Sequence, residues 1–200
     1  MDAHDTAAIV IGGSAGALEA LGVILPALPS SCDVPIVVVV HLPPAAPSLL
    51  PAVLQPWTAL LVKEVDDKEP VVGRTIYVAP PNYHLLVERD RTFALSVDDL
   101  VHHSRPAIDV LFESASEVYG PRLAGVVLTG ANADGAAGLA AIKKRGGLTI
   151  AQSPGSAAVP TMPRAAIDTG AVDHVLPPAE IAALLLALTR SGRVDGREPR

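Results

Sequence analysis

The sequence predicts an α/β protein with a doubly wound, mostly parallel sheet, helices on both faces and a small antiparallel hairpin extension. Half of the 200 residues are hydrophobic, whereas aromatic residues make up only 3%. The core must therefore consist of aliphatic side chains, which suits strands that are buried on both faces. Continuous apolar runs, such as residues 7–11 and 35–40, alternate with helical segments, and this alternation indicates parallel βαβ units.

Each apolar or periodic segment predicts one element of this alternation. Strands of the main sheet are predicted at residues 7–11, 35–40, 60–63, 122–128, 147–151 and 173–176. Helices are predicted from about residue 15 to before residue 29, at 47–57, 106–119 and 134–144, from residue 163, and at 178–188. Between residues 66 and 97, three short strands at 75–79, 84–87 and 92–97 predict appended antiparallel hairpins. One domain is expected over residues 1–190, followed by a disordered tail at 191–200.

Composition excludes several classes of partner. The formal net charge of −6 argues against a nucleic-acid partner, which requires a basic face. The first residues are acidic and no apolar run is long enough to span a bilayer, so neither a signal peptide nor membrane insertion is predicted. The single Cys32 permits no disulfide within the chain and favours a reducing compartment. We therefore expect a cytoplasmic protein.

A serine lies in a glycine-rich turn directly after the first predicted strand. Residues 12–16 read Gly-Gly-Ser-Ala-Gly, and Gly-x-Ser-x-Gly between a strand and a helix is the pattern of a nucleophile elbow. The following helix offers unpaired N–H groups to a developing oxyanion. We expect oxyanion donors at Ala15 or Gly16, with a further one at Ala131.

Three residue types that acyl transfer requires follow three of the predicted parallel strands. Ser14 follows the first strand, His41 follows the second, and Asp134 lies in the loop after strand 122–128. Ligands of doubly wound sheets bind beyond the carboxyl ends of the strands. If the second strand and strand 122–128 flank the first, these side chains converge. The sequence then predicts Ser14 as nucleophile, His41 as general base and acid, and Asp134 as the group that orients the imidazole.

Simpler roles exist for each of these residues. Ser14 and Asp134 are both good helix N-cap types, and His41 at a strand end is compatible with a structural histidine. A phosphate-binding turn is a poorer match, because the dinucleotide fingerprint requires glycine where this chain has Ser14 and Ala17.

No metal or cofactor is predicted. His102 and His103 are adjacent in the sequence and cannot both point at one ion in a regular segment. The chain has one cysteine and no His-Glu-x-x-His motif, which argues against zinc.

Several segments resemble the catalytic domain of the chemotaxis receptor methylesterases, the protein-glutamate methylesterase and glutamine deamidase family. The likeness runs from about residue 7 to about residue 188. It is carried by IGGSAGALEA at 11–20, VVHLP at 39–43, YVAPPNYH at 77–84, RPAIDVLF at 105–112, LTGANADGAAG at 128–138 and MPRAAI at 162–167. The resemblance implies hydrolysis of glutamate γ-methyl esters on chemoreceptor cytoplasmic helices by Ser14, His41 and Asp134. A glutamine side-chain amide is a second implied substrate.

The resemblance also implies residues around the substrate. Arg105 falls in a segment that borders the active site in the family and is a candidate contact for a substrate carboxylate. Asn132 and Met162 are candidate pocket-lining residues.

The chain departs from the family pattern in three ways. Family members usually begin with a receiver domain and this chain begins at the catalytic domain, so a separate receiver-domain protein is a candidate regulator. Where the family commonly has Ser-Thr-Gly-Gly, this chain has Ser-Ala-Gly-Ala at residues 14–17. Where the family usually has a Met-Gly pair in the loop that carries the acid, this chain has Ala-Asn at residues 131–132. These changes leave open an esterase for a different substrate, or a non-catalytic binding module on the same fold.

Overall fold

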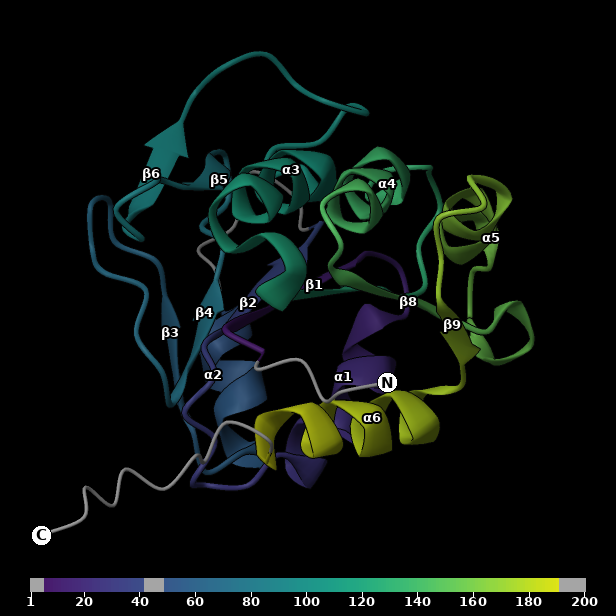
Figure 1. The fold of residues 1–200 in the computed structure, drawn as a ribbon, viewed down its shortest axis with the longest axis horizontal. Helices are drawn as coiled ribbons and strands as arrows, with labels where there is room; N and C mark the ends of the chain where they lie inside the picture. Colours follow the sequence, from purple (N-terminus) through teal and green to yellow (C-terminus); the bar gives the residue numbers. More distant parts are fainter. Residues whose placement is uncertain (1–5, 42–48, 191–200) are drawn as a thin grey trace, which may run out of the picture.

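A computed structural model describes residues 6–41 and 49–190 as a parallel sheet between two layers of helices (Figure 1). The sheet has seven strands in the order β3-β4-β2-β1-β7-β8-β9, and every neighbouring pair is parallel. Its strands are β1 (Ala8–Gly13), β2 (Ile36–Val40), β3 (Leu61–Glu64), β4 (Thr75–Val78), β7 (Leu123–Val127), β8 (Leu148–Gln152) and β9 (His174–Leu176). The predicted fold class is therefore confirmed.

The helices cover both faces of the sheet, as the alternation of segments predicted. Figure 1 shows α1, α2 and α6 on one side and α3, α4 and α5 on the other. Their bounds are α1 (Ala17–Ile24), α2 (Leu50–Leu54), α3 (Ile108–Tyr119), α4 (Ala136–Lys144), α5 (Thr161–Asp168) and α6 (Pro178–Arg190). Four single 3₁₀ turns lie at Leu25–Ala27, Gln55–Trp57, Gly120–Arg122 and Pro154–Ser156. The first residues of the predicted helix at 47–57, and the whole predicted tail at 191–200, lie outside the described residues.

Aliphatic side chains form a core on each face of the sheet. All residues of β1, β2 and β7 are buried. Because successive strand residues face opposite sides, Ile9 and Ile11 pack in the core under α1, whereas Ala8 and Val10 pack in the core under α3. Burial of each Ile or Leu side chain contributes about 1.5–3 kcal/mol, so the fully buried central strands contribute strongly to the stability of the fold.

The three central strands have the order that the convergence of Ser14, His41 and Asp134 requires. β1 lies between β2 and β7, with Gly13 opposite Val40 and Gly12 opposite Val127. The carboxyl ends of these three strands therefore open onto the same edge of the sheet, where ligands of this architecture bind.

The prediction for residues 75–79 is wrong in one respect. β4 is not part of a hairpin but a parallel strand of the main sheet, between β2 and β3. Only β5 (His84–Val87) and β6 (Phe93–Ser96) form the antiparallel extension. All four β4 residues are buried, and Tyr77 packs edge-on against Phe93 while its hydroxyl donates to the Pro70 carbonyl at 3.2 Å. Burial on both faces decides the pairing, and strand spacing along the chain does not reveal it.

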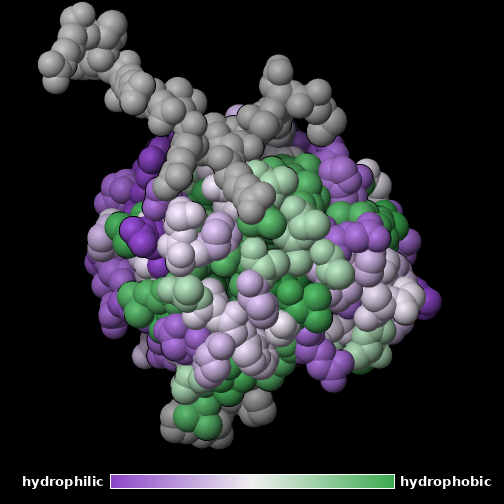
Figure 2. All heavy atoms as spheres, turned by 90° about the horizontal axis from the view of Figure 1, so that it is seen from below, coloured by the Kyte–Doolittle hydropathy of each residue, from purple (hydrophilic) through white to green (hydrophobic). Residues whose placement is uncertain are grey.

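The outer face of the helix layer formed by α1, α2 and α6 carries some apolar surface. Figure 2 shows green surface among polar side chains on this face, and Leu18 and Val23 of α1 and Val53 of α2 are exposed. Within the described residues, no helix combines the length and the apolar character needed to cross a membrane.

Candidate active site

Ser14 follows β1 in a tight strand-to-helix turn. Its N–H donates to the Thr129 carbonyl at 2.9 Å, and its own carbonyl accepts the N–H of Ala17, where α1 begins, also at 2.9 Å. Gly16, the residue before the helix, has φ 81°, a value that favours glycine. A Cβ at Gly16 would also lie 2.7 Å from the Cβ of Ala158. The glycine pattern that predicted an elbow is thus required by backbone conformation and by packing.

Gly12 allows the start of α3 to approach the elbow closely. A Cβ at this position would overlap the side chain of Ile108, the first residue of α3. The serine turn and the N-terminus of α3 can come together only because residue 12 lacks a side chain.

His41 occupies the matching position on the neighbouring strand. The register pairs Gly13 with Val40, and the His41 N–H donates to the Gly13 carbonyl at 3.2 Å. Ser14 and His41 are therefore the next residues on two adjacent parallel strands, which are spaced about 4.8 Å apart. This placement follows from the sheet topology that the sequence predicted.

Asp134 binds the imidazole of His41. Nε2 of His41 lies 2.8 Å from Oδ2 of Asp134, and Asp134 is completely buried. The carboxylate also accepts the N–H groups of Ile108 at 2.7 Å and Asp109 at 2.9 Å. Burial acts to raise the pKa of Asp134, but the hydrogen bonds from His41 and from these main-chain groups outweigh it and lower the pKa below its usual value. Asp134 is therefore an ionised acceptor at neutral pH.

An ionised carboxylate can only accept hydrogen bonds, so Nε2 of His41 carries a proton and Nδ1 is the basic nitrogen. Nδ1 lies 3.4 Å from the hydroxyl oxygen of Ser104. Within the described ranges 6–41 and 49–190, no hydrogen bond joins the half-buried Ser14 to His41. The structure thus brings His41 and Asp134 together and places Ser14 at the adjacent strand end. Catalytic hydrogen bonds often tighten only when substrate binds.

Asp109 completes this arrangement, and sequence reasoning did not identify it. It lies in the first turn of α3, and its Oδ1 accepts the N–H groups of Gly135 at 2.9 Å and Gly138 at 2.7 Å. Burial, followed by the nearby charge of Asp134, raises the pKa of Asp109. The only signal in the sequence was an acidic residue among apolar ones at the start of a helix. That carboxylate caps α4, just as Asp134 caps α3.

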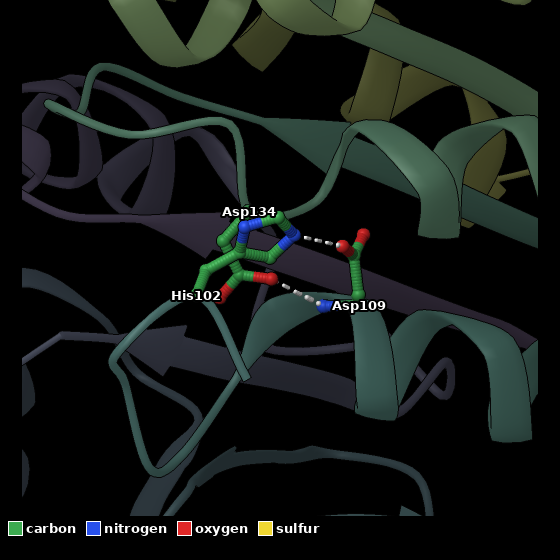
Figure 3. A group of neighbouring side chains, drawn as sticks. All are labelled: His102, Asp109 and Asp134. Carbon is green, nitrogen blue, oxygen red and sulfur yellow. Dashed lines mark hydrogen bonds and ion pairs between the residues drawn. The ribbon is translucent and has the colours of Figure 1, made fainter. Parts of the chain in front are cut away.

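His102, Asp109 and Asp134 form a cluster of residue types that bind metals (Figure 3). Their potential ligand atoms lie within 4.8 Å of one another. However, each of the four carboxylate oxygens already lies within hydrogen-bond distance of a nitrogen, from the main chain or from His41 or His102. These contacts account for the cluster as a hydrogen-bond network.

The predicted oxyanion donors have free main-chain N–H groups. Among the residues that the structure describes, the N–H groups of Ala15, Gly16 and Ala131 have no acceptor. Ala15 and Ala131 are exposed and Gly16 is half-buried. Their roles remain predictions.

A cavity of about 290 Å³ lies beside His41, and Ser104 and Arg105 are among its lining residues. Nη1 of Arg105 donates to the carbonyls of Val97 at 2.8 Å and Asp98 at 3.0 Å, while its buried Nε has no hydrogen-bond partner among the described residues. Arg105 is thus a fixed cation on the cavity wall.

The other two predicted pocket residues do not line this cavity. Met162 is fully buried in the core under α3, and its N–H donates to the Gly130 carbonyl at 3.0 Å. Asn132 accepts the Asp134 N–H at 3.2 Å and lies 3.4 Å from the His102 carbonyl. Asn132 therefore connects the loop that carries Asp134 to the segment that carries His102.

Comparison with known proteins places this chain in a family. The sequence profile of the CheB methylesterases matches residues 9–185. The chain belongs to the CheB methylesterase family. A protein of Leptospira interrogans that provisionally carries the name protein-glutamate methylesterase/protein-glutamine glutaminase is 48% identical over 184 residues, which cover 92% of this chain and 95% of that protein.

Other similar proteins agree with this assignment. A protein-glutamate methylesterase/protein-glutamine glutaminase of Symbiobacterium thermophilum is 40% identical over 183 residues, so the chain spans about half of that relative's length. The crystal structure of the Thermotoga maritima CheB methylesterase catalytic domain matches with a TM-score of 0.86 and 34% identity, over 92% of this chain and 98% of that one. The resemblance in the sequence is thereby confirmed at the level of family and fold.

Proposed function

We propose that this CheB-family chain is a serine esterase that hydrolyses glutamate γ-methyl esters on chemoreceptor-type proteins. The observation that carries the proposal is the His41–Asp134 hydrogen bond of 2.8 Å at the strand end next to Ser14. A buried, ionised carboxylate that fixes one imidazole nitrogen leaves the other free to take a proton from a nucleophile.

In this mechanism the Ser14 hydroxyl attacks the ester carbonyl and its proton passes to Nδ1 of His41. Asp134 stabilises the resulting imidazolium through Nε2. The tetrahedral oxyanion accepts hydrogen bonds from the N–H groups of Ala15 or Gly16, with a further one from Ala131. Its collapse returns the proton to the leaving methanol and forms an acyl-enzyme. Water activated by His41 then releases the glutamate carboxylate and regenerates Ser14.

The same acyl chemistry supports glutamine deamidation as a second activity. The difference lies in the leaving group, which is ammonia rather than methanol. Both relatives described above carry protein-glutamine glutaminase in their names. The proposed site requires no metal or cofactor for either reaction, because the side chains supply the nucleophile and the base.

Arg105 is the proposed contact for a carboxylate of the protein substrate. It is a cation on the wall of the cavity beside His41, and no acidic side chain forms an ion pair with it in the described part of the chain. A charge-assisted hydrogen bond to a carboxylate is typical of arginine.

Regulation by a separate receiver-domain protein is part of the same proposal.

Incubation of the purified protein with methylated chemoreceptor tests the proposal, with methanol release as the measurement. We expect turnover by the wild-type protein and none by Ser14→Ala. A fluorophosphonate probe should label Ser14 and not Ser104, whose hydroxyl lies 3.4 Å from Nδ1 of His41, when the labelled peptide is mapped by mass spectrometry. Turnover of unrelated esters alone would favour a different esterase. The absence of both turnover and labelling would favour a non-catalytic binding module.

A further inference from the structure

His102 lies in a tight turn whose backbone is unusual. The main chains of Val101 and Ser104 exchange two hydrogen bonds, of 3.2 and 2.9 Å. The two central residues, His102 and His103, have φ 49° and φ 60°. A two-residue turn with positive φ at both central positions favours asparagine and glycine, and histidine there costs free energy. Something in the surrounding structure must hold these two residues in place.

This turn contacts His41 directly and reaches Asp134 through two intermediate residues, Asp109 and Asn132. Nε2 of His102 lies 3.1 Å from Oδ2 of Asp109, and the Ser104 hydroxyl lies 3.4 Å from Nδ1 of His41. The His102 carbonyl lies 3.4 Å from Nδ2 of Asn132, which precedes Asp134 in the same loop. The turn therefore spans the region between the base and the carboxylate that orients it.

Asp109 carries the contact of His102 to Asp134. The Asp109 carboxylate accepts the N–H of Gly135, the residue after Asp134, and the Asp109 N–H donates to the Asp134 carboxylate. Figure 3 shows the His102 ring directed at the Asp109 carboxylate, with Asp134 at the main chain of Asp109. One oxygen of Asp109 is thus fixed by α4 and the other by His102. A change in the orientation of this carboxylate would move the loop that positions Asp134.

We infer that His102 is a positioning residue for the reaction proposed above: its imidazole fixes Asp109, and Asp109 holds Asp134 in the orientation that His41 requires. This inference rests on the proposed function, since it concerns the alignment of the same pair. It also explains why a histidine occupies a position where the backbone favours asparagine or glycine. The imidazole gives a contact to Asp109 that neither of those residues can give.

Two substitutions separate the contact from the turn. His102→Asn preserves the turn, because asparagine tolerates positive φ, but its amide nitrogen is one bond closer to the main chain than Nε2 and does not reach Asp109. His102→Gln places an amide nitrogen the same number of bonds from Cα as Nε2 and restores the contact. His174→Asn is the matched control, since His174 lies on the edge strand β9.

We expect His102→Asn to lower kcat for methanol release about threefold to tenfold with KM unchanged, the size of one lost hydrogen bond. His102→Gln should recover most of the wild-type kcat, and His174→Asn should match the wild type. Thermal unfolding of each variant identifies any loss of folded protein. Wild-type kcat in His102→Asn, or an equal loss in His102→Gln, would overturn the role of the contact. Absence of turnover in the wild-type protein would instead contradict the proposed function.

Discussion

Asp109 and Asp134 cap each other's helices. The Asp134 carboxylate accepts the main-chain N–H of Asp109 at 2.9 Å, and the Asp109 carboxylate accepts the main-chain N–H of Gly135 at 2.9 Å. Asp134 therefore satisfies N–H groups at the start of α3, the helix that contains Asp109, and Asp109 satisfies N–H groups at the start of α4, the helix that follows Asp134. An α-helix leaves these groups unpaired. Because one of these carboxylates also binds His41, the stability of the fold and the alignment of the site depend on the same atoms.

Asp134→Asn should lose activity and stability together. An amide accepts only on its oxygen, so at least one of the N–H donors from Ile108, Asp109 and His41 loses its acceptor. We expect kcat for methanol release to fall by about 10⁴, because the imidazole of His41 is then held in the wrong tautomer. We expect the free energy of unfolding to fall by about 1–3 kcal/mol. Asp173→Asn is the control: Asp173 accepts hydrogen bonds from Thr149 at the distant β9 edge. It should lose stability and retain kcat. A rate within tenfold of wild type in Asp134→Asn would refute the assignment.

The two aspartates should give opposite pH dependences of stability. The pKa of Asp134 is lowered in the fold, so its stabilisation is present above the ordinary value of 3.8 and is lost as the pH falls through its folded pKa. The pKa of Asp109 is raised, so its contribution is fully present below 3.8 and is lost as the pH rises through its folded pKa.

Asp109→Asn should therefore gain stability relative to the wild type as the pH rises from 3.8 through the raised pKa of Asp109. Chemical denaturation at a series of pH values measures this difference. The difference in the free energy of unfolding between the wild type and Asp134→Asn should shrink as the pH falls below 3.8. Parallel curves for wild type and Asp109→Asn would show that Asp109 does not titrate differently in the two states.

Gly12→Ala should damage the site through packing. The added methyl group overlaps Ile108 at the start of α3, whose N–H donates to Asp134. We expect a loss of about 1–3 kcal/mol in the free energy of unfolding, and a lower kcat because Asp134 loses alignment. Gly155→Ala is the matched control, since nothing lies within 4 Å of the added Cβ. Urea denaturation and methanol release check both variants, and equal stability of the two would contradict the argument.

Arg105→Met should change substrate preference rather than catalytic rate. If Arg105 binds a substrate carboxylate, kcat/KM should fall about tenfold for methylated peptides with a glutamate beside the ester, and little for matched peptides with glutamine there. Arg145→Met serves as the control, because Arg145 pairs with exposed Glu117 at the far end of α4. An equal loss on both peptides would assign Arg105 a structural role, through its hydrogen bonds to Val97 and Asp98.

Much of the geometry of the candidate site was predictable because strand ends are predictable. The runs before Ser14 and His41 are continuous and aliphatic, so their burial in adjacent parallel strands followed from composition and period. Asp134 was recognisable as an acid in a glycine-containing loop after a third such strand. By contrast, Asp109 and His102 looked like ordinary helix and loop residues, and β4 looked like part of a hairpin.

By itself, the sequence determined the aliphatic parallel sheet, the glycine turn that presents Ser14 and the edge where His41 emerges, because these depend on contacts between near neighbours and on the period of apolar residues. Tertiary structure alone decided that β4 joins the main sheet, that Asp109 and Asp134 exchange main-chain hydrogen bonds, and that His102 bears on Asp109. Those bonds connect polar groups from separate segments, such as residues 109 and 134. Only the packing of α3 and α4 side by side on the sheet brings them within reach.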